Sequence, residues 1–274
     1  MSTMLLLQGI ALVGGLVHTL EPARDEPSRA TVLVMDGRIA ALVPPGEEWP
    51  AIETESGERV VFEPLDLKGK HVVPGLIDAL VNHDPDHDLL YVSAGVTLVR
   101  DLGNDLSRVL AARTARSRDA APGPALLVSG GVLDGVPPVT TEAVVVTDAA
   151  EAEDKLPRLF ELGIDLVSFH LRLGLQRGPE GTDIGEPSTT LAAVARLAHE
   201  SGLQVWGPRL PSLTLAKSAE LGQDGFLYVE AFLGKGDAWG REEDLEEATL
   251  RRAALSPGRP LVPALRLVAL RLEG

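Results

Sequence analysis

One short segment combines the residue types that most often bind metal ions or transfer protons. Residues 82–88 have the sequence NHDPDHD, in which His83 and His87 are four positions apart with aspartates between them. On a regular helix the two imidazoles would share one face and could bind a divalent cation. Pro85 opposes a regular helix there, and a solvated acidic loop explains the same composition. Both interpretations stay open, and Pro85 favours the loop.

A second group of polar residues is expected at the carboxyl ends of neighbouring strands. Ser168 and His170 are two positions apart, so on a strand both side chains point to the same face. His170 is either a neutral, hydrogen-bonded histidine or a metal ligand. A polar pocket could be lined by His83, Asp101, His170, Trp206 and Asp224, and Trp206 with Tyr228 would offer stacking surface to an organic ligand. No pair among these residues has the spacing of a nucleophile and its base.

The apolar runs predict two units that must position these residues. Residues 1–66 contain only strand-length runs, including a strand pair that turns at Gly14-Gly15 and a hairpin signal at Asp36-Gly37. They predict a small β-sandwich-like subdomain. In residues 67–274, strand-length runs alternate with amphipathic stretches, which is typical of a parallel sheet with helical crossovers.

The second unit is expected to be α/β, a TIM-like (β/α) barrel with its site at the carboxyl ends of the strands. Seven strands are predicted, at 71–81, 96–99, 125–129, 166–170, 204–206, 225–229 and 261–268. Helices are predicted at 105–117, 151–162, 189–201, 214–221 and 242–254. The Gly- and Pro-rich stretch 173–187 is either a lid or an irregular connection after the fourth strand.

Seven segments in collinear order carry a resemblance to a known family. They are DLKGKHVVPGLIDA (66–79), GVTLVRDLG (95–103), PGP (122–124), SGG (129–131), GIDLV (163–167), GLQVWG (202–207) and GQD (222–224). Together they resemble the amidohydrolase superfamily, in its imidazolonepropionase-like and prolidase-like branch. The resemblance implies a barrel preceded by a β-sandwich, and a metal centre that activates water for attack on C–N or ester bonds.

The same resemblance implies that the metal site has been lost. The family's histidine ligands fall on Leu80 and Asn82 in the first strand, Pro208 in the fifth and Tyr228 in the sixth, and its lysine ligand falls on Ser168 in the fourth. The eighth strand, with its aspartate, is expected beyond Gly274. Loss of an outer-shell partner alone costs ~10–100-fold in metal affinity, so five ligand substitutions remove at least ~10⁵-fold. The expected cofactor is therefore none. The alternative is one divalent metal such as zinc, held by His83, His87 and His170.

Composition limits the partners of the protein. Twenty-five basic and 40 acidic residues give a net charge of −15, which repels nucleic acid and anionic lipid. No segment approaches the ~18 uninterrupted apolar residues of a membrane span, so a cytoplasmic protein is expected. Cysteine is absent, which excludes disulfides and thiol chemistry. The Arg-rich, Pro-rich, Cys-free composition is of a kind often seen in thermostable proteins.

These observations favour a non-catalytic binding, regulatory or scaffolding homologue of the amidohydrolases, with a small molecule as ligand. The alternative is a metal-dependent hydrolase of amide, cyclic amide or ester bonds that uses a relocated mononuclear site. A barrel without its eighth strand would leave unpaired strand edges, which proteins usually cover. A homodimer is therefore expected, and its rival is a monomer in which the chain covers its own opening.

Overall fold

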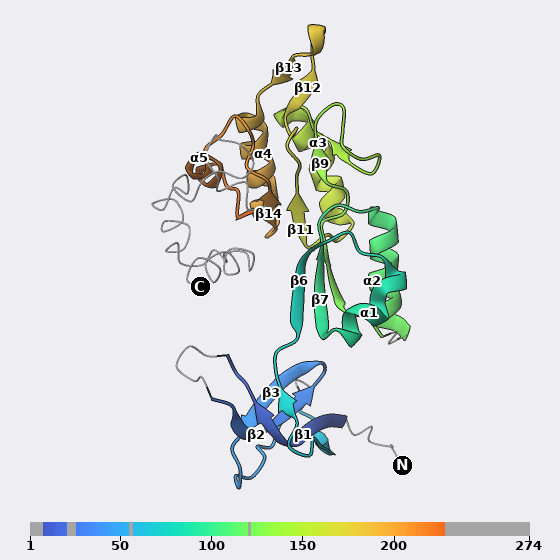
Figure 1. Cartoon of the computed structure of the whole chain (residues 1–274), viewed down its shortest axis with the longest axis vertical. Helices are drawn as coiled ribbons and strands as arrows, with labels where there is room; N and C mark the ends of the chain where they lie inside the picture. Colours follow the sequence, from blue (N-terminus) through green and yellow to red (C-terminus); the bar gives the residue numbers. More distant parts are fainter. Residues whose placement is uncertain (1–7, 21–25, 55–56, 120–121, 228–274) are drawn as a thin grey trace. The chain divides into compact units, whose positions relative to one another are not determined.

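The computed structural model describes residues 8–20, 26–54, 57–119 and 122–227 (Figure 1). The chain divides into two compact units between Gly75 and Leu76. The expected strand at 261–268, the expected helix at 242–254 and Tyr228 lie outside the described residues.

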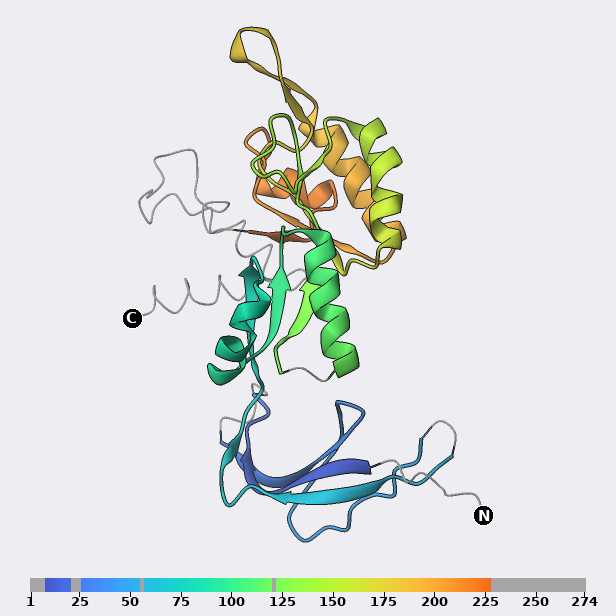
Figure 2. The same cartoon turned by 90° about the vertical axis from the view of Figure 1, so that its right-hand side faces the viewer.

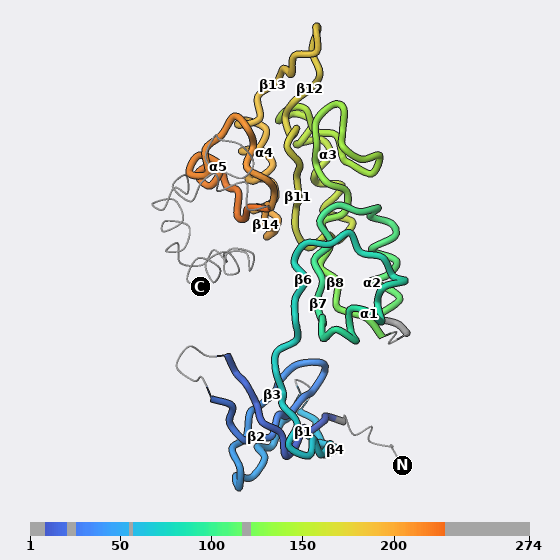
Figure 3. The backbone as a smooth tube through the Cα atoms, in the orientation of Figure 1, coloured from blue at the N-terminus to red at the C-terminus, as the bar shows by residue number. Residues whose placement is uncertain are grey.

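The first unit is built on one five-stranded sheet, which Figure 3 traces at the start of the chain. Its strands are β1 (Gln8–Val17), β2 (Ser28–Met35), β3 (Arg38–Val43), β4 (Val61–Asp66) and β5 (His71–Val72). The order is β3-β2-β1-β4, with β5 continuing beside β1. Asp36 and Gly37 both have positive φ and join β2 to β3, which confirms the predicted hairpin. Ala11, Leu33 and Val43 are buried in the core of this unit.

The predicted turn at Gly14-Gly15 is wrong, because β1 runs through both glycines as one strand. The register of β1 against β2 shifts between Leu12 and Gly15, and Gly14 has φ +71. Glycine adopts this left-handed conformation without steric cost, so the chain forms a bulge here and keeps its direction.

The end of the first unit lies further along the chain than the expected boundary after residue 66. β5 pairs in parallel with β1 through Leu16 and Val17, which attaches residues 71–72 to the first sheet. The single strand expected at 71–81 is therefore two strands, β5 and β6 (Leu76–Val81). Pro74, which has no backbone N–H to donate to a ladder, lies between them.

The second unit alternates strands and helices as predicted. Its main parallel strands are β6, β7 (Val96–Asp101), β8 (Ala125–Val128), β11 (Leu166–Ser168), β14 (Gln204–Gly207) and β15 (Gly225–Phe226). Its helices are α1 (Asp88–Ser93), α2 (Leu106–Asp119), α3 (Ala149–Glu161), α4 (Pro187–Glu200) and α5 (Leu215–Glu220), and Figure 2 shows α2 beside β7 and β8.

The strands follow one another in sequence order across two three-stranded sheets, β6-β7-β8 and β11-β14-β15. A hydrogen bond from the Asp165 N–H to the Val128 carbonyl links them at 2.8 Å. This order is that of a (β/α) barrel, but the described strands form no closed barrel. Within the described ranges, no helix is long and apolar enough to cross a membrane.

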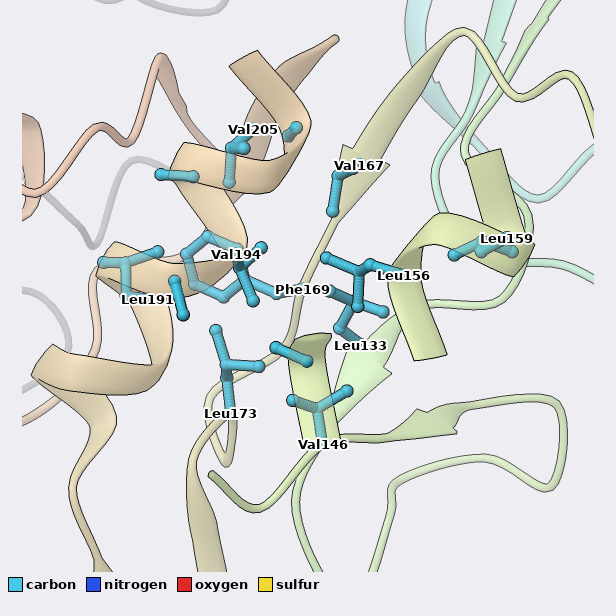
Figure 4. Packing of buried hydrophobic residues seen from close by; sticks show 14 of the residues in the cluster. Leu133, Val146, Leu156, Leu159, Val167, Phe169, Leu173, Leu191, Val194 and Val205 are labelled. Atoms are coloured by element: carbon cyan, nitrogen blue, oxygen red, sulfur yellow. The ribbon is translucent and has the colours of Figure 1, made fainter. Parts of the chain in front are cut away.

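The main core lies between the parallel strands and the helices α3 and α4 (Figure 4). Phe169 follows β11 and projects among Leu156 of α3 and Leu191 and Val194 of α4, all nearly fully buried. A second cluster, formed by Val99, Val109, Leu126 and Val128, joins β7 and β8 to α2. Val99, Val167 and Val205 point toward these helices. Because side chains alternate along a strand, the residues that follow them, Arg100, Ser168 and Trp206, point to the opposite face of the strands, which is called the inner face below.

The polar stretch 173–187 forms an ordered hairpin at the carboxyl end of β11. Its strands are β12 (Leu175–Arg177) and β13 (Asp183–Gly185), and the short pair β9 (Leu133–Asp134) and β10 (Val144–Val145) lies earlier in the chain. The Arg172 guanidinium donates to both Asp183 carboxylate oxygens, at 2.8 and 3.0 Å, and it holds the pKa of Asp183 below its usual value. The base of the hairpin is thus fixed by an ion pair.

Candidate functional site

The candidate site is the set of strand ends where the resemblance predicts metal ligands. Leu80 on β6 is exposed and apolar, and Asn82 beyond it is exposed. Ser168 and Pro208 are buried, at the ends of β11 and β14. The fifth position, Tyr228, is outside the described residues. None of the four described side chains is an imidazole, a carboxylate or a lysine.

Ser168 is held by a partner that the sequence analysis did not identify. Its hydroxyl lies 2.9 Å from the hydroxyl of Ser129, which follows β8, and 3.2 Å from the Leu102 carbonyl that accepts from it. Both serines are 1% exposed. The Ser129 hydroxyl also lies 3.2 Å from the Gly130 carbonyl. Each hydroxyl has one proton, so either Ser129 donates to Ser168 and Ser168 to Leu102, or Ser168 donates to Ser129 and Ser129 to Gly130. The chain of bonds ends on a backbone carbonyl, so nothing in it can accept a proton as a general base.

Asp101 organises the loops that follow β6 and β7. Its carboxylate is fully buried and accepts from the His83 N–H at 2.6 Å and from the Asn104 side-chain amide at 3.2 Å. Asn104 also donates to the His83 carbonyl at 2.8 Å. A buried carboxylate needs such donors, and here they come from the backbone and an amide within the loops. Asp101 is therefore committed to loop structure, and Asn104 is a contributor that sequence spacing did not indicate.

His83 contacts side chains of α1 and α2. Its Nε2 lies 2.8 Å from the Asp88 carboxylate and 2.9 Å from an Arg116 guanidinium nitrogen, and Arg116 also donates to Asp88. The ring of Tyr91 stacks on it at 6.4 Å between centroids. Burial raises the pKa of Asp88, but the hydrogen bonds from Arg116 and His83 lower it more, so the net pKa is below the usual value.

The structure does not bring the three candidate metal-binding histidines together. His87 ends a 3₁₀ turn, Pro85–His87, and is exposed; the turn agrees with the expectation that Pro85 prevents a regular helix. The His170 N–H donates to the Leu133 carbonyl after β11. Across the described ranges, no group of three or more His, Asp or Glu side chains is placed to hold a metal ion.

Asp224 is separated from the expected pocket because it precedes β15, at the amino end of that strand. Its carboxylate accepts from the Val205 N–H at 2.8 Å and lies 2.7 Å from Nε2 of His199 on α4. Asp165 before β11 repeats this arrangement, with the Val128 N–H at 2.9 Å and Arg113 of α2 at 2.7 Å. Residues at the amino ends of barrel strands usually serve stability. Both aspartates therefore fasten strands and helices.

Trp206 is on the inner face, but one side of its ring is already covered. The Arg100 guanidinium lies 3.9 Å from the ring centroid, and its Nε donates to the Ala79 carbonyl at 2.8 Å. Burial lowers the pKa of Arg100 to about 10, which still leaves it charged at neutral pH. The contact is a cation–π interaction, and the sequence analysis missed Arg100. The indole is 3% exposed and packs with Leu102, Leu166 and Leu227.

No protein-family profile matches the sequence. Among solved structures, a putative prolidase from Bifidobacterium longum is similar, with TM-score 0.62 and 21% identity over 83% of this chain and 57% of that chain. A Xaa-Pro dipeptidase with bound methionine in the active site has TM-score 0.58 and 16% identity, and the match covers 82% of this chain and 63% of that chain. Bottromycin amidohydrolase has TM-score 0.60 and 19% identity, and the match covers 89% of this chain and 48% of that chain. This chain thus spans about half to two thirds of these proteins, and it shares the fold of amidohydrolase- and prolidase-like structures.

Proposed function

We propose that the protein is an amidohydrolase-related binding protein without the metal-dependent hydrolase site of that fold. The observation that carries the proposal is the Ser129–Ser168 hydroxyl pair. It occupies the position that the resemblance assigns to a metal-binding lysine, and its hydrogen bonds end on the Leu102 or the Gly130 carbonyl. A neutral hydroxyl pair of this kind supplies neither a charged ligand nor a general base.

The surrounding residues support the loss of metal chemistry at the other positions. The side chains of Leu80 and Pro208 are hydrocarbon and contain no atom that could bind a metal ion in place of an imidazole. His83 and Asp101 could in principle bind a metal ion, but both are engaged elsewhere. His83 contacts Asp88 and Arg116, and Asp101 accepts from Asn104. The ligand class that fits this proposal is a small organic molecule at the carboxyl ends of the strands, where sites of this fold are built.

The alternative is a hydrolase with a relocated site made by His83, His87 and His170. It requires His83 to release Asp88 and Arg116, and it requires the three imidazoles to come together. No contact within the described residues favours that rearrangement, so the alternative is kept as an outcome of the test below.

The test is a metal analysis of tag-free protein purified without added metal, paired with a screen against amides, esters and lactones. We expect no stoichiometric Zn²⁺ or Mn²⁺ and no turnover, before or after either metal is added. Hydrolysis that requires one metal ion per chain, is abolished by a chelator and is lost in His83→Asn but not in Ser93→Ala would overturn the proposal in favour of the relocated site.

We also propose that the protein is a homodimer in which a second copy covers strand edges that have no partner among the described strands. Exposed parallel edges present unpaired N–H and C=O groups, and symmetric pairing is the simplest way to cover them. Light scattering at micromolar concentration measures the mass directly. A monomer mass of 29.0 kDa, the mass of this chain, would contradict the dimer.

A further inference from the structure

Two imidazoles face each other in the first unit, which contains none of the residues discussed as a site above. Nε2 of His18 lies 2.7 Å from Nδ1 of His71, and the ring centroids are 5.0 Å apart with 36° between the planes. His71 is exposed and His18 is partly exposed. Among the six histidines of the chain, all of them in described positions, no other pair has ring nitrogens in contact.

The sheet itself brings the two rings together. β1 and β5 run in parallel with Leu16 opposite His71 and Val17 opposite Val72, and the His18 N–H donates to the Val72 carbonyl at 2.9 Å. His18 is two positions beyond Leu16, so it lies on the same face as Leu16 and as the partner of Leu16, His71. The pair is therefore a consequence of the backbone register.

Two imidazole nitrogens at this distance can share one proton or one metal ion. In the neutral pair, one ring donates its N–H to the lone pair of the other. If each ring carries its proton on its far nitrogen, both facing nitrogens present lone pairs. Zn–N bonds of 2.0–2.1 Å at tetrahedral or right angles place two ligand nitrogens ~2.9–3.3 Å apart. A widening by a few tenths of an ångström is therefore enough, and side chains at the surface can rotate to give it.

We propose that His18 and His71 form a binding site for one divalent transition-metal ion of the class that prefers imidazole, Cu²⁺, Ni²⁺ or Zn²⁺. Water fills the remaining coordination positions, so the ion is exchangeable. Both histidines belong to the first unit, so this site is distinct from the ligand site proposed for the second unit. The ion links the end of β1 to β5, which is two residues long. It therefore fastens the last strand of the first unit at the point where the chain leaves it.

The experiment uses the full, tag-free chain after removal of metal by a chelator and titration with Ni²⁺ in a calorimeter. We expect one ion per chain, and at least about tenfold weaker binding in His18→Asn and in His71→Asn, since even loss of an outer-shell partner costs ~10–100-fold. The matched control is His199→Asn, which removes an imidazole that is paired with Asp224 in the second unit. It should leave the affinity unchanged.

A second measurement needs no variant. Substoichiometric Cu²⁺ should broaden the NMR imidazole signals of His18 and His71 first, with His87 and His170 unaffected at the same ratio. Absence of binding by wild-type protein, or broadening confined to His83, His87 or His170, would overturn the inference. Circular dichroism shows whether each variant is folded. Because the second unit is not involved, the outcome is separate from that of the hydrolase screen.

Discussion

The hydroxyls of Ser129 and Ser168 lie 2.9 Å apart, although the two residues are 39 positions apart in the chain. They meet because β8 and β11 are neighbours: the N–H of Asp165, just before β11, donates to the carbonyl of Val128, the last residue of β8. The pair places two buried, neutral groups where the amidohydrolase resemblance expects a charged ligand. It is therefore a packing feature of the strand ends, and it is the observation on which the proposed loss of the metal site rests.

The effects of removing Ser129 and Ser168 on the free energy of unfolding should not be additive. Ser168→Ala removes the hydroxyl that donates to the Leu102 carbonyl and leaves Ser129 only the Gly130 carbonyl as acceptor, at a cost of about 1–2 kcal/mol. The double variant Ser129→Ala/Ser168→Ala should cost less than the sum of the single variants, because each single variant already loses the same Ser129–Ser168 hydrogen bond. Urea unfolding followed by circular dichroism measures the cycle, with exposed Ser93→Ala as control. If the stability losses of the two single variants sum to that of the double variant within about 0.3–0.5 kcal/mol, the hydroxyls do not interact.

The Asp88 carboxylate should make the second unit sensitive to acid. Asp88→Ala removes the partner of the largely buried Arg116 and of His83, which should cost about 3 kcal/mol at neutral pH. The net pKa of Asp88 is lowered in the folded state from its model-compound value of 3.8. Its contribution is therefore present above that pH and is lost as the pH falls through the lower, folded pKa.

Urea unfolding as a function of pH tests this expectation. The gap in stability between wild type and Asp88→Ala should narrow progressively below about pH 4. The control is Asp154→Ala, whose ion pair with Arg158 is exposed on α3 and should contribute less than about 1 kcal/mol at any pH. A gap that is constant down to the acid transition would contradict the role given to Asp88.

Asp165 and Asp224 should be equivalent in their contribution to stability. Each accepts the N–H of a fully buried valine on the neighbouring strand, Val128 or Val205. Replacement by alanine leaves that N–H unpaired, at a cost of about 1–3 kcal/mol in either variant. Glu220→Ala, which removes an exposed partner of Lys217, is the control and should change stability by less than about 0.5 kcal/mol. Urea midpoints close to that control would refute the expectation.

Gly225 should be required because the Trp206 ring occupies the space of a β-carbon. A Cβ built at Gly225 would lie 2.1 Å from Cε3 of that ring. Gly225→Ala should therefore destabilise the protein by about 1–3 kcal/mol through overpacking. In a Trp206→Leu background the same change should cost clearly less, because the clashing ring atoms are gone. Equal costs in both backgrounds, measured by chemical unfolding, would show that another contact is responsible.

Much of the fold follows from local patterns in the sequence. The Asp36-Gly37 hairpin and the alternation of strands and helices in the second unit were predicted, because turn chemistry and hydrophobic periodicity are local properties. Where the structure differs, the deciding interaction is between distant segments. Gly14 is a bulge within a strand because β2 pairs on both sides of it, and His71 belongs to the first sheet because β1 pairs with it.

The site divides along the same line. The sequence alone determines which side chains stand at the expected ligand positions, so the absence of imidazole at Leu80, Asn82, Ser168 and Pro208 needed no structure. Only the tertiary structure decided the partners: Ser129 for Ser168, Arg100 for Trp206 and Arg116 for His83. The physical reason is that residue type fixes what chemistry a group can perform. Hydrogen bonds and burial, in contrast, depend on which strands and helices become neighbours, and that is set by packing over the whole unit.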